Sequence, residues 1–369
     1  MLTRLVRPTL IRHLLATAVA GALVVILTFG LEPYRNYQLA TVAAYLCATA
    51  GLTVLVGLSG QLSLGHGALM AVGAYAYALS SVRLGDNGTT GPLLLVLPLL
   101  AAVVASAVVG GIVGLAGARL HGPYLAGLTL TLTIVVPAIT TTFTGQLGGD
   151  QGLSVLVEPA PAGLGVAFPL ERWQAWIASA ATLLVMLLLS NLVSSRFGRE
   201  MRAVRDDEVA ARLAGINIRR TKVIVFTVSA ACAGLGGGII AFLTQSASPG
   251  AFGLTLSLFL LMAVVIGGIG TLAGAVWGAL LLVALPEITD SLANSIGGSS
   301  QLAERLDGNL SLGVFGLVLI LVTIVFPRGI QGVFADAIQR IRPSPTTQSQ
   351  PVGTTTDPST TTSSESTDA

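Results

Sequence analysis

Residues 196–222 read RFGREMRAVRDDEVAARLAGINIRRTK and hold eight of the 19 basic residues of this 369-residue chain. Four acids are mixed among them, and apolar runs lie on both sides. In a membrane protein, loops with an excess of Lys and Arg stay on the cytoplasmic side. This charged loop is therefore a fixed point from which the crossings of the chain can be counted.

The composition of the whole chain indicates a polytopic membrane protein. It is 53% hydrophobic and 10% charged, whereas a soluble domain carries about 25% charged residues. We expect an all-α transmembrane domain over residues 1–342, beginning with an uncleaved first span. Residues 343–369 are rich in Thr and Ser and have almost nothing to bury, so they predict a disordered cytoplasmic tail.

The apolar runs predict about ten transmembrane helices. A span needs about 20 residues, and one run, at residues 251–286, is too long for a single helix. The runs cover roughly residues 14–31, 38–57, 62–82, 92–118, 123–143, 173–193, 223–244, 251–286 and 310–326.

Arginines fix the orientation of these spans. Arg4, Arg7 and Arg12 place the N-terminus in the cytoplasm, and arginines after the last run do the same for the C-terminus. An even number of crossings must then follow the charged loop, so the long run crosses twice, with a turn at residues 267–270. A re-entrant hairpin with eight true spans stays open as the alternative.

Within the charged loop, the spacing of apolar residues predicts a short amphipathic helix, roughly Arg202 to Ala214, that ends at Gly215. Val209, Leu213 and Ile216 should share one face, as should Met201 and Val204, and Glu208 precedes Arg212 by the four residues of a helical ion pair. Two interpretations stay open: the helix docks into a groove of another protein, or it lies on the lipid surface.

A second motif, GLSGQLSLGHG at residues 57–67, separates two apolar runs. Its four glycines and its polar residues indicate a break in a helix, of the kind that forms substrate sites in transporters. Gln61, Ser63 and His66 are therefore candidate residues of a substrate pathway. The alternative is a short cytoplasmic turn with a helix N-cap at Ser63, in which His66 serves packing alone.

Other patterns indicate packing or exclude classes of protein. Glycines recur every four residues at 110/114, 234/238 and 270/274/278, which permits close helix crossing. Cys47 and Cys232 are expected to be buried and unpaired. The chain has no P-loop, no metal-spaced cluster, no nucleophile elbow and few charges within its spans. We therefore expect neither an enzyme nor a proton-coupled carrier.

Several segments together resemble the permeases of branched-chain amino acid importers of the ATP-binding-cassette (ABC) class, most closely the LivM-like branch. They are residues 57–67, 197–208 and 211–217, and the later motifs Gly267-Gly268-x-Gly270-Thr271-x-x-Gly274 and Pro327-Arg328-Gly329-Ile330. In order, they cover about residues 40–335. The Thr/Ser-rich tail departs from the pattern of the family.

The resemblance implies a non-enzymatic permease of the bacterial inner membrane that works by alternating access, with both termini cytoplasmic. It also implies as partners two ATP-binding subunits, a second homologous permease and a periplasmic or lipid-anchored substrate-binding protein, with no nucleic acid and no cofactor in this chain. ATP would be bound by the partners. The residues implied to couple to them are Ala203, Val204, Arg205, Asp206, Asp207, Glu208, Ala211 and Gly215.

The substrate implied is a branched-chain amino acid. Relatives that carry urea or short amides share these motifs, so the same importer class with such a substrate is the alternative. A stand-alone secondary transporter is a further rival; it should show acids within the membrane or paired helix breaks.

Overall fold

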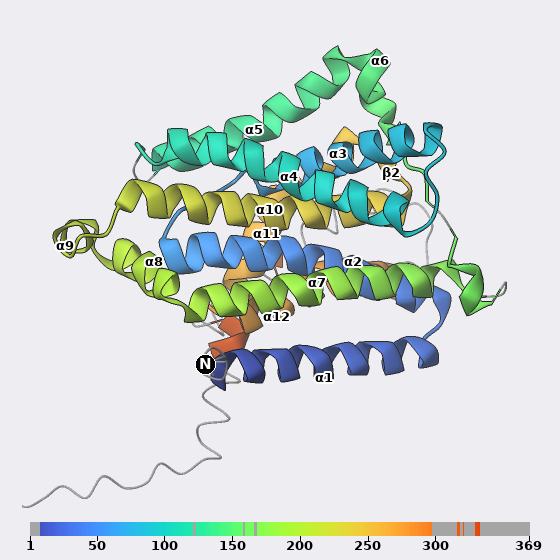
Figure 1. Cartoon of the computed structure of the whole chain (residues 1–369), viewed down its shortest axis with the longest axis horizontal. Coiled ribbons are helices and arrows are strands. Elements are labelled where there is room, and N and C mark those ends of the chain that lie inside the picture. The colour runs from blue at the N-terminus through green and yellow to red at the C-terminus, as the bar shows by residue number, and fades with distance from the viewer. Residues whose placement is uncertain are drawn as a thin grey trace, which may run out of the picture.

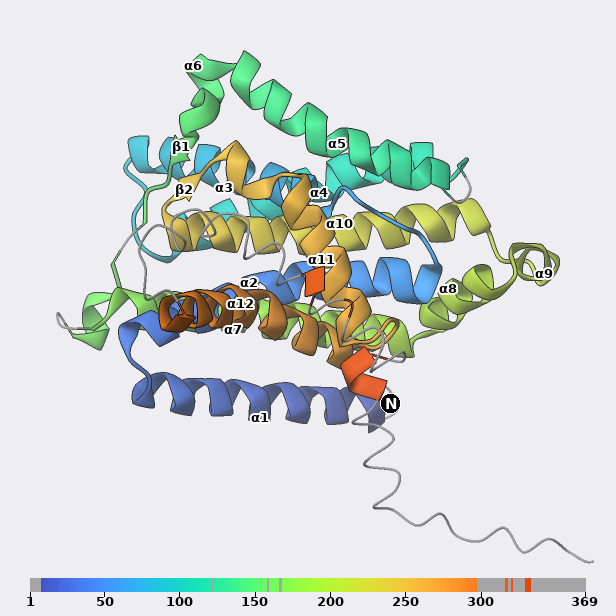
Figure 2. The same cartoon turned by 180° about the vertical axis from the view of Figure 1, so that it is seen from behind.

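The computed structural model describes residues 8–120, 123–157, 159–165, 168–296, 316–317, 320 and 329–332. Most of these residues form long α-helices that lie side by side (Figures 1 and 2). Within these described residues, seven helices are long and apolar enough to cross a membrane. The prediction of an all-α polytopic membrane protein is therefore confirmed.

The helices, in chain order, are α1 (Pro8–Gly30), α2 (Pro33–Leu52), α3 (His66–Asp86), α4 (Pro92–Gly117), α5 (Pro123–Thr142), α6 (Thr144–Leu147), α7 (Leu170–Ser194), α8 (Arg196–Asp206), α9 (Glu208–Leu213), α10 (Ile218–Thr244), α11 (Leu254–Gly267) and α12 (Leu272–Ile296). A π-helical turn, Thr53–Leu58, extends α2. Short 3₁₀ turns occupy Gly149–Gln151, Ala162–Leu164 and Pro249–Phe252.

Two short strands mark one end of the bundle. β1 (Leu153–Ser154) pairs antiparallel with β2 (Ser246–Ala247), so the α6–α7 connection is joined to the chain that follows α10. We call this end the strand end. The helices α8 and α9 project from the opposite end, which we call the charged end (Figure 1).

Helix α10 is the centre of the bundle and packs against α2, α3 and α4. Glycines bring these backbones together. A Cβ atom on Gly73 would lie 2.2 Å from the Gly234 carbonyl oxygen, and one on Gly110 would lie 2.1 Å from the Cβ of Ala230. The packing role predicted for the glycines spaced by four in α4 and α10 is thus confirmed.

The long apolar run divides as predicted. Helix α11 ends at Gly267 and α12 begins at Leu272, and between them Gly268 and Gly270 adopt φ values of 121° and 90°. These are left-handed conformations that favour glycine. A Cβ atom on Gly278 would lie 2.2 Å from the Ala263 carbonyl oxygen, so the two helices touch along small residues. The turn predicted at residues 267–270 is confirmed.

Helix α12 lies antiparallel to α2 along most of the length of α2. The Thr49 hydroxyl donates to the Ala275 carbonyl at 3.3 Å, and nearer the strand end the Tyr34 hydroxyl donates to Glu287. The α11 part is only 14 residues long and is steeply inclined to its neighbours (Figure 2). Pro249–Gly267 is long and apolar enough to cross a membrane, whereas the apolar part of α12, Leu272–Ile288, is shorter. The choice between two crossings and a re-entrant hairpin therefore stays open.

Some predictions fall outside the described residues. Most of the span expected at 310–326, the tail at 343–369, and Arg4 and Arg7 are among them. The total of ten spans and the orientation of the termini therefore stay predictions.

The close contact between α3 and α10 gives a test of the packing. A Cβ atom on Gly237 would lie 1.9 Å from the Met70 carbonyl oxygen. We expect Gly237→Ala to destabilise the purified protein by about 1–3 kcal/mol, because overpacking forces backbones apart. The measurement is the thermal unfolding midpoint in detergent. Gly127→Ala is the control, since a Cβ atom there meets nothing within 4 Å; equal effects of the two variants would contradict the packing argument.

Candidate functional site

The predicted helix break lies between the π-helical turn and α3. Helix α2 continues through that turn to Leu58, and α3 begins only at His66. The residue that precedes α3 is Gly65, which provides no side-chain cap. The N-cap expected at Ser63 in the alternative interpretation is therefore wrong, although the Ser63 hydroxyl accepts from the Gly65 N–H at 3.4 Å. The other part of that alternative, a short cytoplasmic turn, stays open. Single π-turns in helices occur often at functional sites, because they redirect the backbone.

Side chains from three other helices bind the backbone groups that the break leaves free. The Gly57 carbonyl accepts a hydrogen bond from Arg205 Nη1 at 2.7 Å. The Leu64 N–H donates to Thr129 Oγ1, and the Gly67 N–H donates to Ser257 Oγ, both at 2.9 Å. Backbone groups that are buried away from water need such partners, because an unpaired buried N–H or C=O is costly.

Gln61, Ser63 and His66 are all buried in the break, with 4%, 0% and 0% of their surfaces exposed. The His66 ring lies between Ser63 Oγ at 3.1 Å and Ser229 Oγ, on α10, at 2.9 Å. Ser63 and His66 thus lie together, and both bind partners within the chain. Their role as a substrate pathway stays a prediction.

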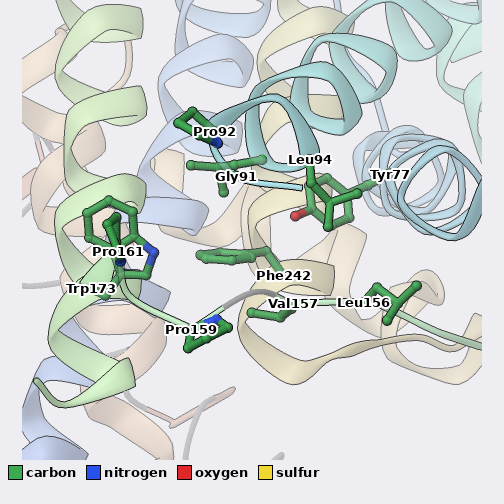
Figure 3. A pocket seen from close by; sticks show the side chains of 11 residues that line it. Tyr77, Gly91, Pro92, Leu94, Leu156, Val157, Pro159, Pro161, Trp173 and Phe242 are labelled. Carbon is green, nitrogen blue, oxygen red and sulfur yellow. The ribbon is translucent and has the colours of Figure 1, made fainter. Parts of the chain in front are cut away.

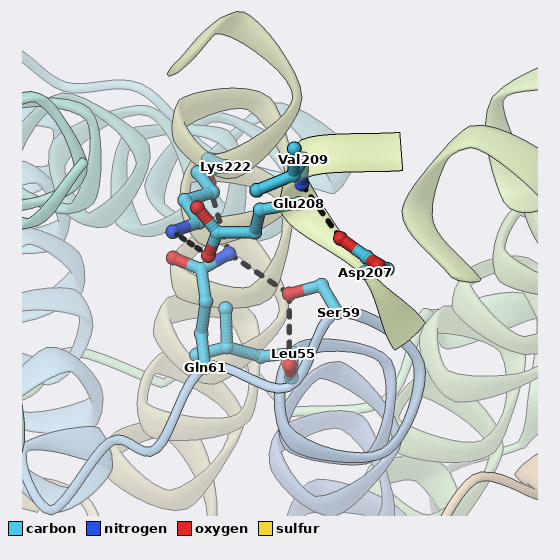
Figure 4. A network of polar contacts seen from close by, with 7 residues as sticks. All are labelled: Leu55, Ser59, Gln61, Asp207, Glu208, Val209 and Lys222. Carbon is cyan, nitrogen blue, oxygen red and sulfur yellow. Dashed lines mark hydrogen bonds and ion pairs between the residues drawn. The ribbon is translucent and has the colours of Figure 1, made fainter. Parts of the chain in front are cut away.

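Gln61 connects the break to the start of α10. Its amide donates to Ser59 Oγ at 2.8 Å and to the Lys222 carbonyl at 3.3 Å (Figure 4). Ser59 in turn donates to the Leu55 carbonyl at 2.9 Å, within the last turns of α2. The break is therefore tied to α2 on one side and to α10 on the other.

The charged loop forms two helices, so the prediction of one helix from Arg202 to Ala214 is wrong. Helix α8 ends at Asp206, and Asp207 is extended, with φ −156° and ψ 111°. The Asp207 carboxylate accepts from the N–H groups of Val209 and Ala210 at 2.8 and 3.1 Å. Asp is a strong N-cap. Its capping bonds therefore start a new helix, α9, at a position that the apolar spacing alone places inside one continuous helix. Gly215, with φ +81°, ends the segment as predicted.

The apolar faces of the charged loop point in different directions. Met201 and Val204 are buried as a pair, and Ala211 joins Val204 and Ile218 in a small cluster. Val209 and Leu213 are 69% and 85% exposed, while Ile216 packs on the small cluster, so the predicted common face of these three is wrong. Helix α9 thus presents two large apolar side chains outward at the charged end.

An ion pair joins α9 to α10. Lys222 Nζ lies 2.6 Å from Glu208 Oε1, and the lysine side chain is 8% exposed (Figure 4). The helical spacing had indicated Arg212 as the partner of Glu208, and it gave no sign of Lys222, which is 14 residues away. Through the Lys222 carbonyl and Gln61, α9 is therefore connected to the helix break.

Arg205 makes a second connection from the charged loop. One nitrogen binds the Gly57 carbonyl, and Nε and Nη2 bind the exposed Asp206 carboxylate at 2.9 and 2.7 Å. Gly57 also touches the α11–α12 turn, because a Cβ atom on it would lie 2.4 Å from the Gly270 nitrogen. Three parts of the fold therefore meet at Gly57: α8, the helix break and the turn between α11 and α12.

A small apolar pocket of about 200 Å³ lies at the strand end, far from this network. Tyr77, Trp173 and Phe242 line it together with prolines and aliphatic residues (Figure 3). It contains none of the predicted site residues. In the part of the chain that the structure describes, no group of three His, Cys, Asp or Glu side chains is arranged to hold a metal ion.

Comparison with known proteins identifies relatives of the chain. Residues 34–323 match the family described as branched-chain amino acid transport system / permease component. The high-affinity branched-chain amino acid permease LivM of Escherichia coli is 33% identical over 265 residues, which cover 66% of this chain and 61% of LivM. The match thus spans less than two thirds of that relative.

Two other relatives from Escherichia coli show the breadth of the similarity. The branched-chain amino acid permease LivH is 26% identical over 79% of this chain and 92% of LivH. The xylose permease XylH is 32% identical over 37% of this chain and 35% of XylH. No solved structure matches the chain.

The buried hydrogen bond between His66 and Ser229 gives a second test. Removal of the serine hydroxyl leaves a ring nitrogen buried without its partner, which costs about 1–3 kcal/mol of stability. We expect Ser229→Ala to lower the thermal unfolding midpoint more than Ser81→Ala. Ser81 is a matched control because it is equally buried and its hydroxyl donates to the Ala78 carbonyl of its own helix. The same small decrease in both variants would contradict this role of Ser229.

Proposed function

The chain belongs to the branched-chain amino acid transport permease family, and on this premise we propose that it is a membrane-spanning subunit of an ATP-driven importer of leucine, isoleucine and valine. It pairs with a second homologous permease, as the similarity to both LivM and LivH suggests. Two ATP-binding subunits bind the charged end, and a separate binding protein delivers substrate to the strand end. The charged end is then cytoplasmic, and the membrane is the bacterial inner membrane.

The observation that carries this proposal is the outward-facing apolar pair on α9. Val209 and Leu213 stand on an ordered, capped helix between charged side chains. Their exposure to water is unfavourable by about 25 cal/mol for each Å² of apolar surface, and a groove on a protein partner removes this cost. The charged residues around them supply complementary contacts for such a partner rather than for the acyl chains of lipids.

Coupling proceeds through the contacts between this loop and the helix break. When ATP binding moves the partner subunits, α8 and α9 move with them. Arg205 then pulls on the Gly57 carbonyl, and Glu208 moves Lys222 at the start of α10. The break lies between α2 and α3 and contacts α5, α10 and α11. A movement of the break therefore shifts these helices relative to one another, which opens the pathway to one side of the membrane and closes it to the other.

Gln61, Ser63 and His66 are proposed to contact the substrate when this break opens. In the conformation described they bind protein groups and are closed to solvent. A substrate with amino and carboxyl groups replaces these hydrogen bonds as the helices separate, so the polar residues keep partners in both states.

Substrate uptake tests the proposed function. Proteoliposomes that hold the complete importer should accumulate leucine in an ATP-dependent manner, and not urea, a short amide or xylose. We expect Leu213→Glu to abolish uptake and co-purification of the ATP-binding subunits while the chain stays folded, because the side chain is exposed. Leu164→Glu, an exposed residue toward the opposite end, is the control for co-purification of the ATP-binding subunits, which it should leave unchanged. Uptake of urea or an amide instead of leucine would contradict the substrate assignment.

Arg205 provides a separate test of coupling. A hydrogen bond to a charged group contributes about 1.5–3 kcal/mol, so Arg205→Gln should lower the number of leucine molecules transported per ATP about tenfold or more. ATP hydrolysis itself should continue, because the docking surface is kept. The control is Arg196→Gln, since Arg196 is 87% exposed and pairs only with Glu200 of its own helix in the described structure. A proportional decrease in transport and hydrolysis would argue against this role.

A further inference from the structure

A groove of about 500 Å³ lies between α2 and α12, toward the strand end. One wall is a single face of the chain around α2, with Leu31, Arg35, Gln38, Leu39 and Val42 spaced by three or four residues. The facing wall is a matching stripe of α12 at residues 280, 283, 284, 287 and 288.

The polar groups of the groove lie together in the half nearer the strand end. Arg35, Gln38 and Glu287 lie between two aliphatic residues at the strand end, Leu31 and Ile288, and a larger aliphatic set toward the middle of the bundle, Leu39, Val42, Leu280 and Val283. Arg35 is a cation on one wall and Glu287 is an anion on the other. A ligand that fits this pattern carries both charges at one end and a compact apolar group at the other.

Both charged side chains keep hydrogen-bonding capacity for a ligand. One Arg35 nitrogen donates to Gln38 Oε1 at 2.8 Å, and a guanidinium has five N–H donors. The Tyr34 hydroxyl donates to one oxygen of Glu287, and a carboxylate accepts several bonds through its two oxygens.

We propose that this groove binds a free α-amino acid with a branched aliphatic side chain, an inference that rests on the proposed transport function. The ligand carboxylate binds the Arg35 guanidinium, whose planar fork matches it. The ligand ammonium binds Glu287. The aliphatic side chain lies among Leu39, Val42, Leu280 and Val283.

The physical setting favours this ligand over neighbouring chemistries. Charge-assisted hydrogen bonds are roughly twice as strong as neutral ones, and an α-amino acid would make one with each wall. Urea and short amides lack both charges and the branched side chain.

Protection of an introduced thiol tests the site directly. Ala284 lines the groove and is exposed. In the membrane complex of the two permeases and the two ATP-binding subunits, with no binding protein added, the Ala284→Cys variant should therefore react with a small thiol reagent. The two native cysteines are buried. Saturating leucine should slow the reaction about tenfold. Two analogues should leave the rate unchanged: leucinol, which lacks the carboxylate, and 4-methylpentanoate, which lacks the amine. Asn87→Cys, exposed in the connection between α3 and α4, is the control and should react equally with and without leucine.

The charged residues give the second arm of the experiment. Arg35→Gln and Glu287→Gln, each in the Ala284→Cys background, should weaken the protection by leucine about tenfold or more. Tyr34→Phe should preserve it, because the Glu287 carboxylate remains. Protection that survives both charge substitutions would overturn the assignment.

The outcomes separate this inference from the proposed function. If the importer transports leucine but leucine does not protect the thiol, the groove is not a substrate site although the function stands. The same conclusion follows if the reaction rate changes with the phospholipid supplied and not with leucine. If the complete importer does not transport leucine while leucine still protects the thiol, the proposed function fails and the binding site remains.

Discussion

The structure depends on one constraint: every backbone polar group that is buried away from water must find a partner in the protein. A continuous helix meets this constraint by itself, but residues 60–65 do not form one. Arg205, Thr129 and Ser257 therefore supply the missing hydrogen bonds from α8, α5 and α11. Because the break is held from outside itself, any movement of those helices changes its hydrogen bonds.

The close packing of helices makes such movement collective. Gly57 lies against Gly270, and α10 touches α3 through Gly73 and Gly234 without intervening side chains. Backbones in direct contact cannot slide far without separation, since there are no flexible side chains to adjust. A displacement of α8 at the charged end is thus passed on to α2 and to the α11–α12 turn as movements of whole helices.

Local signals in the sequence predicted much of this fold. Hydropathy predicted the helices, the glycine cluster at 267–270 predicted a turn, and the glycines of residues 57–67 predicted a helix break. Predictions failed where two local signals competed, as at Asp207, whose capping of α9 prevailed over helical periodicity. They also missed partners that are distant in the chain. Lys222 and Ser229 meet Glu208 and His66 only because α10 folds back beside α9 and α3.

The antiparallel pair of α2 and α12 connects the two functional regions. Toward the strand end, the pair forms the groove that contains Arg35 and Glu287. At the charged end, the same chain segments meet as Gly57 and Gly270, beside Arg205. A ligand that binds both walls of the groove stabilises one distance between α2 and α12 at the strand end. The Arg205–Gly57 contact stabilises one position of the same chain segments at the charged end. Because the two equilibria are linked, ligand binding changes the free energy of the Arg205–Gly57 contact by the same amount as that contact changes the free energy of ligand binding. In the proposed importer, a pair of rigid helices held at both ends is therefore sufficient to relate substrate binding on one side of the membrane to nucleotide-driven movement on the other.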